Sequence, residues 1–208
     1  MRGDKPVLNK PKLEGDAMKR AILTVVMAVM AISAPAWADE WKVNFSLGAG
    51  LRTMNSGWGD ATSQNSVDVK FDFRKVSWPV NILLAYSQGS SNNDFTCIDN
   101  FGSSVFCKLG LSEVDLGVIK YFEGGGSFVP YVSAGLGSSS FQVTTSSASS
   151  VTSGQTSTGL FLDGGVLLKF TANWRAGLDV KMLTGTGSML PGLNANYIQY
   201  GLFLGFGF

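Results

Sequence analysis

A strict two-residue alternation of side chains constrains the fold of this chain more than any other feature. From residue 41 to residue 52 every odd position is apolar, and every even position is polar, charged or glycine. The alternation returns in seven further segments: 67–74, 80–86, 113–122, 128–137, 160–170, 174–183 and 197–208. A period of two places alternate side chains on opposite faces of a β-strand. The sequence therefore predicts an all-β fold with eight strands.

The connections between these segments alternate in length. The short ones are KVSW, EGGGS and TAN, which begin at residues 75, 123 and 171. The long ones are rich in Ser, Thr, Asn and Gly and span 53–66, 87–112, 138–158 and 184–196. If neighbouring strands are antiparallel, every long connection lies at the same end of the sheet. Short periplasmic turns and long extracellular loops are typical of an antiparallel transmembrane β-barrel of the outer membrane.

The N-terminal region has the layout of a secretory signal peptide. A basic start at Met18 is followed by an apolar run over 21–32 and a small-residue site that ends at Ala38. The apolar run is shorter than the roughly 20 residues of a membrane-spanning helix, which disfavours the alternative of an N-terminal anchor. We therefore expect an upstream extension over 1–17, a signal peptide over 18–38, cleavage between Ala38 and Asp39, and a barrel domain over 39–208.

The apolar face of the strands is expected to point outward. It carries about forty apolar side chains, which is too much volume for an eight-stranded lumen that side chains only just fill. The opposite face is rich in glycine and carries a nearly balanced set of charges. This set comprises Lys42, Arg52, Lys70, Arg74, Lys169, Arg175 and Lys181 with Asp68, Asp72, Glu113, Asp115, Asp163 and Asp179.

Outward placement of these thirteen charges is energetically excluded. A Lys or Arg at the bilayer midplane costs roughly 2–4 kcal/mol, and a whole domain is stabilised by only about 5–15 kcal/mol. Lys120 alone is in phase with the apolar face, near a strand end from which its long side chain can reach the interface. We therefore expect the lumen to be filled by a salt-bridged plug and not by an apolar core.

Aromatic residues gather where the predicted strands meet the short connections. The expected interfacial girdle consists of Trp41, Trp78, Phe122, Phe128, Phe170, Trp174 and Phe208. A ring of aromatic side chains at one height is typical of a membrane–water interface.

The signal peptide, the eight segments, PYVSAGLG at 130–137 and the terminal GLFLGFGF together resemble the small outer-membrane β-barrels of the OmpA, OmpX and opacity-protein kind. The resemblance implies a last strand that the barrel-assembly machinery recognises. The positions that match this signal are Tyr200, Leu202, Leu204, Phe206 and Phe208. Lipid A-modifying barrels of similar size use a histidine with a serine, and this chain has no histidine. A Ser–Lys enzyme is a remote alternative.

Other chemistry-bearing residues have two interpretations each. Cys97 and Cys107 form a disulfide in an oxidising compartment or, less plausibly without histidine, bind a metal. The carboxylates of Glu113 with Asp115, or of Asp68 with Asp72, act as acid and base or bind Ca²⁺, or they neutralise nearby cations. The apolar residues of loop 87–112 form a contact surface or pack on the barrel rim.

The sequence thus favours a non-catalytic outer-membrane barrel with a structural or surface-interaction role. A narrow channel is the alternative. The expected partners are outer-membrane lipid and lipopolysaccharide, the assembly machinery and an extracellular ligand at loop 87–112, with no cofactor. Residues 39–208 carry ten basic and twelve acidic residues, so no basic patch for nucleic acid is expected.

Overall fold

A computed structural model describes residues 41–55, 58–91, 93, 95–98, 104–145, 155–190 and 193–207. Residues 41–208 form one compact unit. The upstream extension, the signal peptide with its cleavage site, and Phe208 lie outside the described residues, so these expectations stay predictions.

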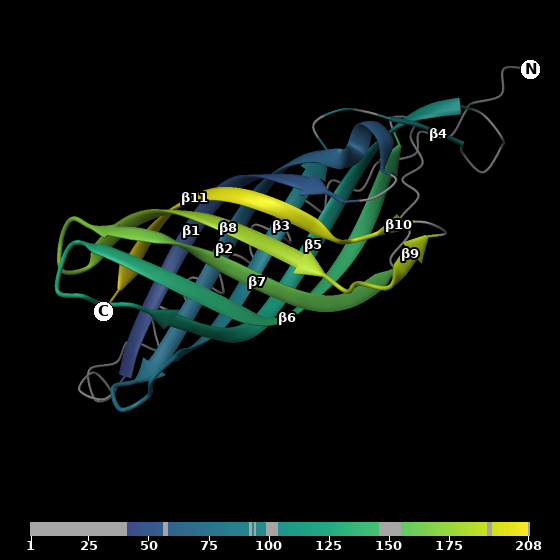
Figure 1. Ribbon diagram of the computed structural model, residues 1–208. Helices are drawn as coiled ribbons and strands as arrows, with labels where there is room; N and C mark the ends of the chain where they lie inside the picture. The colour runs from purple at the N-terminus through teal and green to yellow at the C-terminus, as the bar shows by residue number, and fades with distance from the viewer. Residues whose placement is uncertain are drawn as a thin grey trace, which may run out of the picture. The chain divides into compact units, whose positions relative to one another are not determined.

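Eight long antiparallel strands close into a barrel (Figure 1). They are β1 (Trp41–Met54), β2 (Ser63–Lys75), β3 (Asn81–Ser91), β5 (Ser104–Tyr121), β6 (Phe128–Thr145), β7 (Thr156–Lys169), β8 (Trp174–Thr184) and β11 (Tyr197–Gly207). The order is β3-β2-β1-β11-β8-β7-β6-β5, and pairing of β3 with β5 closes the circle. The last strand lies beside the first, with Asn44 opposite Gly207 and Met54 opposite Tyr197. The all-β class, the eight strands and the closure by β11 are as the sequence predicts.

Several long connections are shorter than predicted, because the strands that flank them continue into the expected loops. β3 runs on to Ser91, β5 begins at Ser104 and β6 runs on to Thr145. Beyond Leu136 the outer face of β6 changes to Ser138, Ser140 and Gln142, while the inner face stays buried. This change removes the apolar half of the alternation, so the segment looks like a loop in the sequence. The expected loop 87–112 is therefore mostly strand, which corrects that prediction.

The two ends of the barrel differ. The short connections 76–80, 122–127 and 170–173 lie at one end, where Gly125 adopts a positive φ of 80°. At the other end are η2 (Gly59–Thr62), β4 (Phe95–Ile98), β9 (Ser188–Leu190) and β10 (Leu193–Asn194). We call these the short-turn end and the long-loop end.

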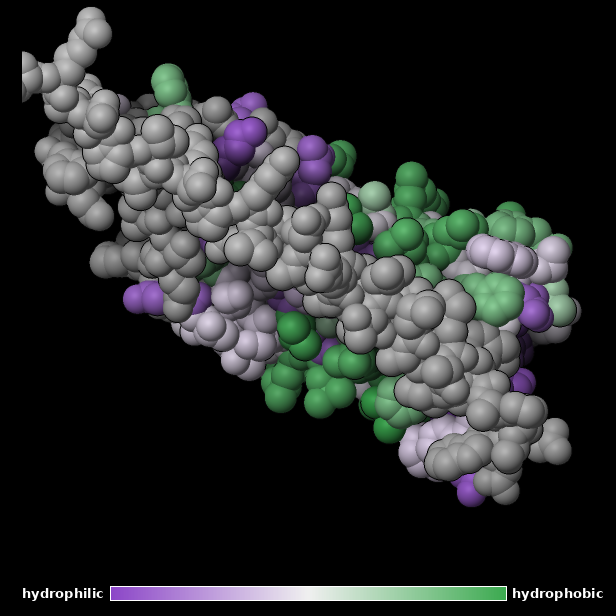
Figure 2. Space-filling view, turned by 180° about the vertical axis from the view of Figure 1, so that it is seen from behind, coloured by the Kyte–Doolittle hydropathy of each residue, from purple (hydrophilic) through white to green (hydrophobic). Residues whose placement is uncertain are grey.

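The outer face of the barrel is apolar and the inner face mixes charge with apolar side chains. Leu116 and Tyr200 are about 60% exposed, whereas Asp115 and Gln199, the residues directly before them, are buried. Figure 2 shows hydrophobic side chains gathered on the outside of the barrel. No described helix is long and apolar enough to cross a membrane.

Candidate functional site

The lumen holds ten of the thirteen charges of the expected network. They are Arg52, Asp68, Lys70, Asp72, Glu113, Asp115, Asp163, Arg175, Asp179 and Lys181. Each lies on the inward-facing phase of its strand, which explains why the alternation located them. Their ion pairs do not form one continuous plug but fall into separate groups.

Lys70 is the centre of the first group. Its ammonium lies 2.8 Å from Asp163 Oδ2 and 2.5 Å from Asp179 Oδ2, so that β2 is tied to β7 and β8 across the lumen. The ammonium also lies over the rings of Phe203 and Tyr131, at 5.6 and 6.0 Å from their centroids. We call Lys70, Asp163 and Asp179 the Lys70 triad.

Lys181 is the centre of a second group of the same design. Its ammonium lies 2.7 Å from Glu113 Oε1 and 2.5 Å from Asp115 Oδ2. Tyr197 donates a hydrogen bond of 2.7 Å from its hydroxyl to Glu113 Oε1, and the Ser139 hydroxyl lies 3.2 Å from Glu113 Oε2. We call Lys181, Glu113 and Asp115 the Lys181 triad. Both carboxylates of the Glu113–Asp115 pair are thus engaged by a cation, as the neutralising interpretation expects.

Two balanced pairs accompany the triads. Arg175 Nη2 lies 3.8 Å from Asp72 Oδ2, and the Tyr121 hydroxyl donates to the same oxygen at 2.8 Å. Arg52 and Asp68 are joined through the amide of Gln199. Arg52 Nε donates to Gln199 Oε1 at 3.0 Å, and Gln199 Nε2 donates to Asp68 Oδ2 at 2.8 Å.

The remaining three network residues lie at the rim of the short-turn end. Lys42 is exposed, and Lys169 and Arg74 lie 3.0 and 4.0 Å from the carboxylate of Glu123. The hydrogen bond from Lys169 lowers the pKa of the Glu123 carboxyl, which burial only partly opposes. The sequence could not place Glu123 because it lies in a turn, outside the alternating segments.

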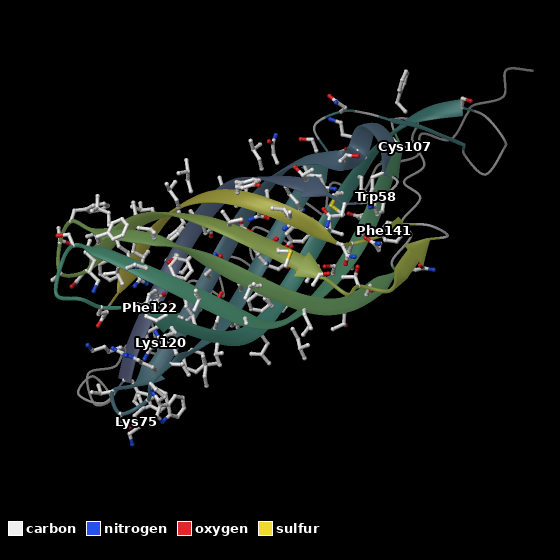
Figure 3. All side chains as sticks on the ribbon, viewed as in Figure 1. Trp58, Lys75, Cys107, Lys120, Phe122 and Phe141 are labelled. Atoms are coloured by element: carbon white, nitrogen blue, oxygen red, sulfur yellow. The ribbon has the colours of Figure 1, made fainter. Side chains whose placement is uncertain are left out.

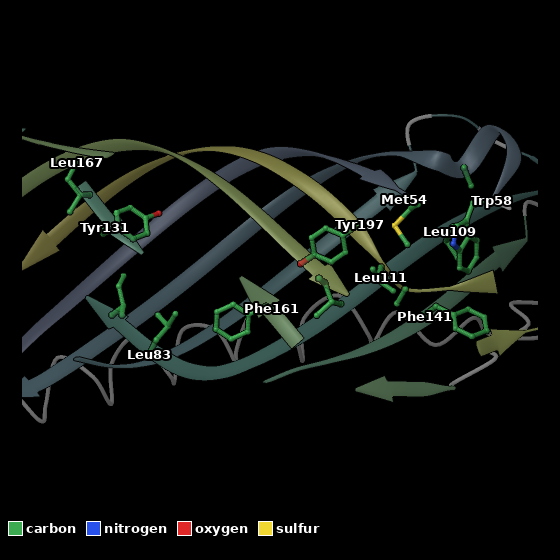
Figure 4. Close-up of a cluster of buried hydrophobic side chains, with 14 of the residues drawn as sticks. Met54, Trp58, Leu83, Leu109, Leu111, Tyr131, Phe141, Phe161, Leu167 and Tyr197 are labelled. Atoms are coloured by element: carbon green, nitrogen blue, oxygen red, sulfur yellow. The ribbon is translucent and has the colours of Figure 1, made fainter. Parts of the chain in front are cut away.

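The interior is also apolar at the long-loop end, which corrects the expectation of a purely salt-bridged filling. Met54, Trp58, Leu109, Leu111 and Phe141 gather there (Figure 4). Trp58 donates from Nε1 to the carbonyl of Asn194 at 2.9 Å, and its ring meets the Phe141 ring at 6.2 Å. We call these five residues the apolar cap. The sequence missed it because the cap is built from segments that had been assigned to loops.

Six of the expected girdle residues are described. Trp78, Phe122 and Phe170 lie in the short connections, Phe128 and Trp174 begin the strands after them, and Trp41 begins β1 opposite Lys75. Trp41 contacts Trp78 and Trp174 contacts Phe206, with ring centroids 5.5 and 5.1 Å apart. Figure 3 shows Lys75, Lys120 and Phe122 at this end. Lys120 donates to the carbonyl of Pro79 at 2.5 Å. The interfacial role of the girdle stays a prediction.

The expected assembly signal forms the outer face of the closing strand. Tyr200, Leu202 and Leu204 are exposed, and Phe206 is half-buried. The fifth member, Phe208, lies outside the described residues.

The two cysteines lie in the region where β4 pairs with β5. Cys97 is opposite Val105, and Phe95 is opposite Cys107. Cys107 is buried and is not a free thiol. The side chain of Cys97 is not among those described, so the disulfide stays a prediction.

The described side chains provide no group of three or more His, Cys, Asp or Glu residues that fits a metal ion.

A closed antiparallel barrel with an apolar exterior and a charged interior defines the class of transmembrane β-barrels. The family model of the outer membrane protein beta-barrel domain matches residues 24–208. The chain therefore belongs to this family of bacterial integral outer-membrane proteins.

Several solved structures share the fold. Neisserial surface protein A is 16% identical with a TM-score of 0.54, and the match covers 80% of this chain and 95% of that one. Ail of Yersinia pestis is 12% identical with a TM-score of 0.55, covering 81% and 99%. OprG of Pseudomonas aeruginosa is 13% identical with a TM-score of 0.54, covering 81% and 96%. No curated protein matches the chain by sequence.

Proposed function

We propose that this protein is a non-catalytic outer-membrane barrel with a structural or surface-interaction role that it exerts through its long loops. The observation that carries the proposal is the filled lumen. Two lysine-centred triads, two balanced pairs and the apolar cap occupy the interior of the described barrel, which favours a filled lumen over one that passes a substrate or a solute. Interaction with other molecules then falls to the loops at the long-loop end.

The relatives give this proposal limited support, because their similarity reaches only the fold. Ail is described as an attachment invasion locus protein and has been solved in complex with the heparin analogue sucrose octasulfate. Neisserial surface protein A is described as a surface protein. A surface role for this chain is compatible with both descriptions.

The test replaces the residues between β3 and β5, at the long-loop end. We expect a Gly-Ser linker in place of residues 92–103 to leave the barrel folded and to reduce attachment of bacteria that display the protein to immobilised heparin, an analogue of which is bound in the Ail complex, at least tenfold. Strand residues up to Ser91 and from Ser104 are kept, because Leu109 and Leu111 belong to the apolar cap. The same replacement of residues 146–154 is the matched control for a general effect of loop length.

Heat-modifiable gel migration verifies folding of each variant. Equal attachment of the 92–103 variant and the unmodified protein contradicts a role for this loop. A channel function, the alternative, requires the triads to separate. Planar-bilayer conductance that disappears after neutralisation of Lys70 or Asp163 counts in its favour and against the interaction role.

Further parts of the proposal concern processing and assembly. We propose cleavage between Ala38 and Asp39, which the mass of the mature protein tests, and a Cys97–Cys107 disulfide, which thiol labelling before and after reduction tests. The proposed partners are outer-membrane lipid and lipopolysaccharide along the apolar exterior, and the barrel-assembly machinery at β11.

Deletion of Phe208 tests the assembly signal. We expect secretion to be unchanged and the heat-modifiable, membrane-inserted fraction to fall several-fold, because the last aromatic of the Tyr200–Phe208 outer face is lost. Deletion of Met1–Ala17, which lies before the signal peptide, is the control and is expected to leave insertion unchanged. Normal insertion without Phe208 contradicts the assembly role.

A further inference from the structure

The buried charges of the lumen do not balance among the residues that the structure describes. Six carboxylates face four cations there, whereas the sequence alone suggested near equality. The carboxylates are Asp68, Asp72, Glu113, Asp115, Asp163 and Asp179, and the cations are Arg52, Lys70, Arg175 and Lys181. The difference arises because three basic residues of the expected network lie at the rim.

The excess is confined to the two triads. Asp72 is balanced by Arg175, and Asp68 is balanced by Arg52 through the Gln199 amide. Each triad has two carboxylates and one ammonium, so each carries one uncompensated negative charge. An unpaired ion in a water-excluded interior costs several kcal/mol, which a protein avoids by neutralising the group.

Unsatisfied oxygen atoms lie on the same residues. Asp115 Oδ1, Asp163 Oδ1 and Asp179 Oδ1 are buried without a hydrogen-bond partner. The three residues are 1%, 2% and 6% exposed. Buried polar atoms normally have partners. Guanidinium nitrogens of Arg52 and Arg175 are also unsatisfied, but these two residues belong to the balanced pairs. Within the triads all the unsatisfied atoms are carboxylate oxygens, in agreement with the excess of negative charge there.

The geometry of the Lys70 triad limits which positive group can compensate the excess charge. Asp163 and Asp179 both contact the Lys70 ammonium through their Oδ2 atoms. Asp179 Oδ1 lies against Gly201, where an added Cβ would clash with it. A proton adds one positive charge to a carboxyl oxygen without further ligands. A metal ion needs several ligands, and the described residues provide no group of three acidic, His or Cys side chains for one.

We propose that each triad binds one proton, so that the folded lumen takes up two positive charges from solution. In the Lys70 triad the proton is held by Asp163 or Asp179, whose Oδ1 atoms have no other partner, and it is faced by Lys70, Tyr131 and Asp68. In the Lys181 triad it is held by Asp115 beside Glu113, and it is faced by Lys181, Tyr197 and Arg52. With these two positive charges bound, the buried charges of the described lumen sum to zero.

The test measures how many positive charges unfolding releases. The chain has no histidine, and ordinary carboxyls titrate near 4, so the carboxyl side chains of the unfolded protein are already ionised between pH 6 and 8. The equilibrium constant of unfolding in detergent is therefore expected to rise about 100-fold per pH unit in this window, tenfold for each proton. Exchange of choline for Na⁺ at constant pH and ionic strength is expected to leave the constant unchanged. A fall of about 100-fold for each tenfold rise of Na⁺ overturns the proposal.

Variants assign the charges to the triads. Asp163→Asn and Asp115→Asn each remove one excess charge, so each is expected to halve the number of cations released, and the double variant is expected to release none. Asp179→Asn replaces Asp163→Asn if that protein does not fold. Asp72→Asn removes a balanced charge and is expected to keep a release of two. Unfolding of the unmodified barrel that does not depend on pH, or a release unchanged in Asp163→Asn and Asp115→Asn, overturns the proposal.

Discussion

Replacement of Lys181 by methionine is expected to lower the free energy of unfolding by about 3–5 kcal/mol, the usual effect of removing one partner of a buried ion pair. Lys181 is 4% exposed, and it is the only cation within 4 Å of Glu113 and Asp115 among the described residues. Without it, two carboxylates remain two positions apart on β5 in a water-excluded lumen. Methionine keeps most of the side-chain volume, so the loss reports on charge and not on a cavity.

The measurement is urea unfolding of the refolded barrel in detergent, followed by tryptophan fluorescence. Two comparisons separate charge from packing. The triple change Lys181→Met with Glu113→Gln and Asp115→Asn leaves no unpaired charge and is expected to recover most of the loss. Lys169→Met, at the rim beside a half-exposed Glu123, is expected to cost less than about 1 kcal/mol. Equal losses for Lys181→Met and Lys169→Met contradict the role of the triad.

The sequence was sufficient for the fold because membrane burial imposes the alternation on every strand. Lipid requires an apolar side chain at each outward position, so Leu47, Leu116 and Leu202 mark the strands without any knowledge of their pairing. The pairing of β11 with β1 follows from closure, since an open sheet edge is not tolerated in the hydrocarbon.

The strand ends were less predictable, because the constraint ends with the membrane. In the part of β6 beyond Leu136, Ser138 and Gln142 lie on the outer face in contact with water, while Phe141 packs inside the barrel. The charge groups were unpredictable for a different reason. The alternation shows that Lys70 faces inward, but its partners lie on β7 and β8, at 93 and 109 residues' distance. Strand tilt and register decide which inward residues meet, and neither is readable from one strand.

Replacement of Gly135 by valine is expected to lower the free energy of unfolding by about 3 kcal/mol or more, at the upper end of overpacking effects. Gly135 lies in β6, opposite Gly117 on one side and Phe161 on the other. A Cβ at Gly135 comes within 2.7 Å of Phe161 Cε1 and closer still to the Leu116 carbonyl oxygen. One contact is a ring and the other is backbone, so a rotamer change cannot relieve both.

Gly164 in β7 is the matched control, because it is a glycine of the same barrel on the outward-facing phase. A Cβ there meets only Tyr131 O at 3.6 Å and Val132 Cγ1 at 3.9 Å, which are ordinary contacts. Gly164→Val is therefore expected to change stability by less than about 1 kcal/mol and in the favourable direction, since glycine weakens a strand interior. Urea unfolding and the heat-modifiable fraction measure both variants. If Gly135→Val is as stable as Gly164→Val, the prediction is wrong. The Phe161 ring is then not packed tightly against Gly117 and Gly135, and the inner wall has room for a larger side chain.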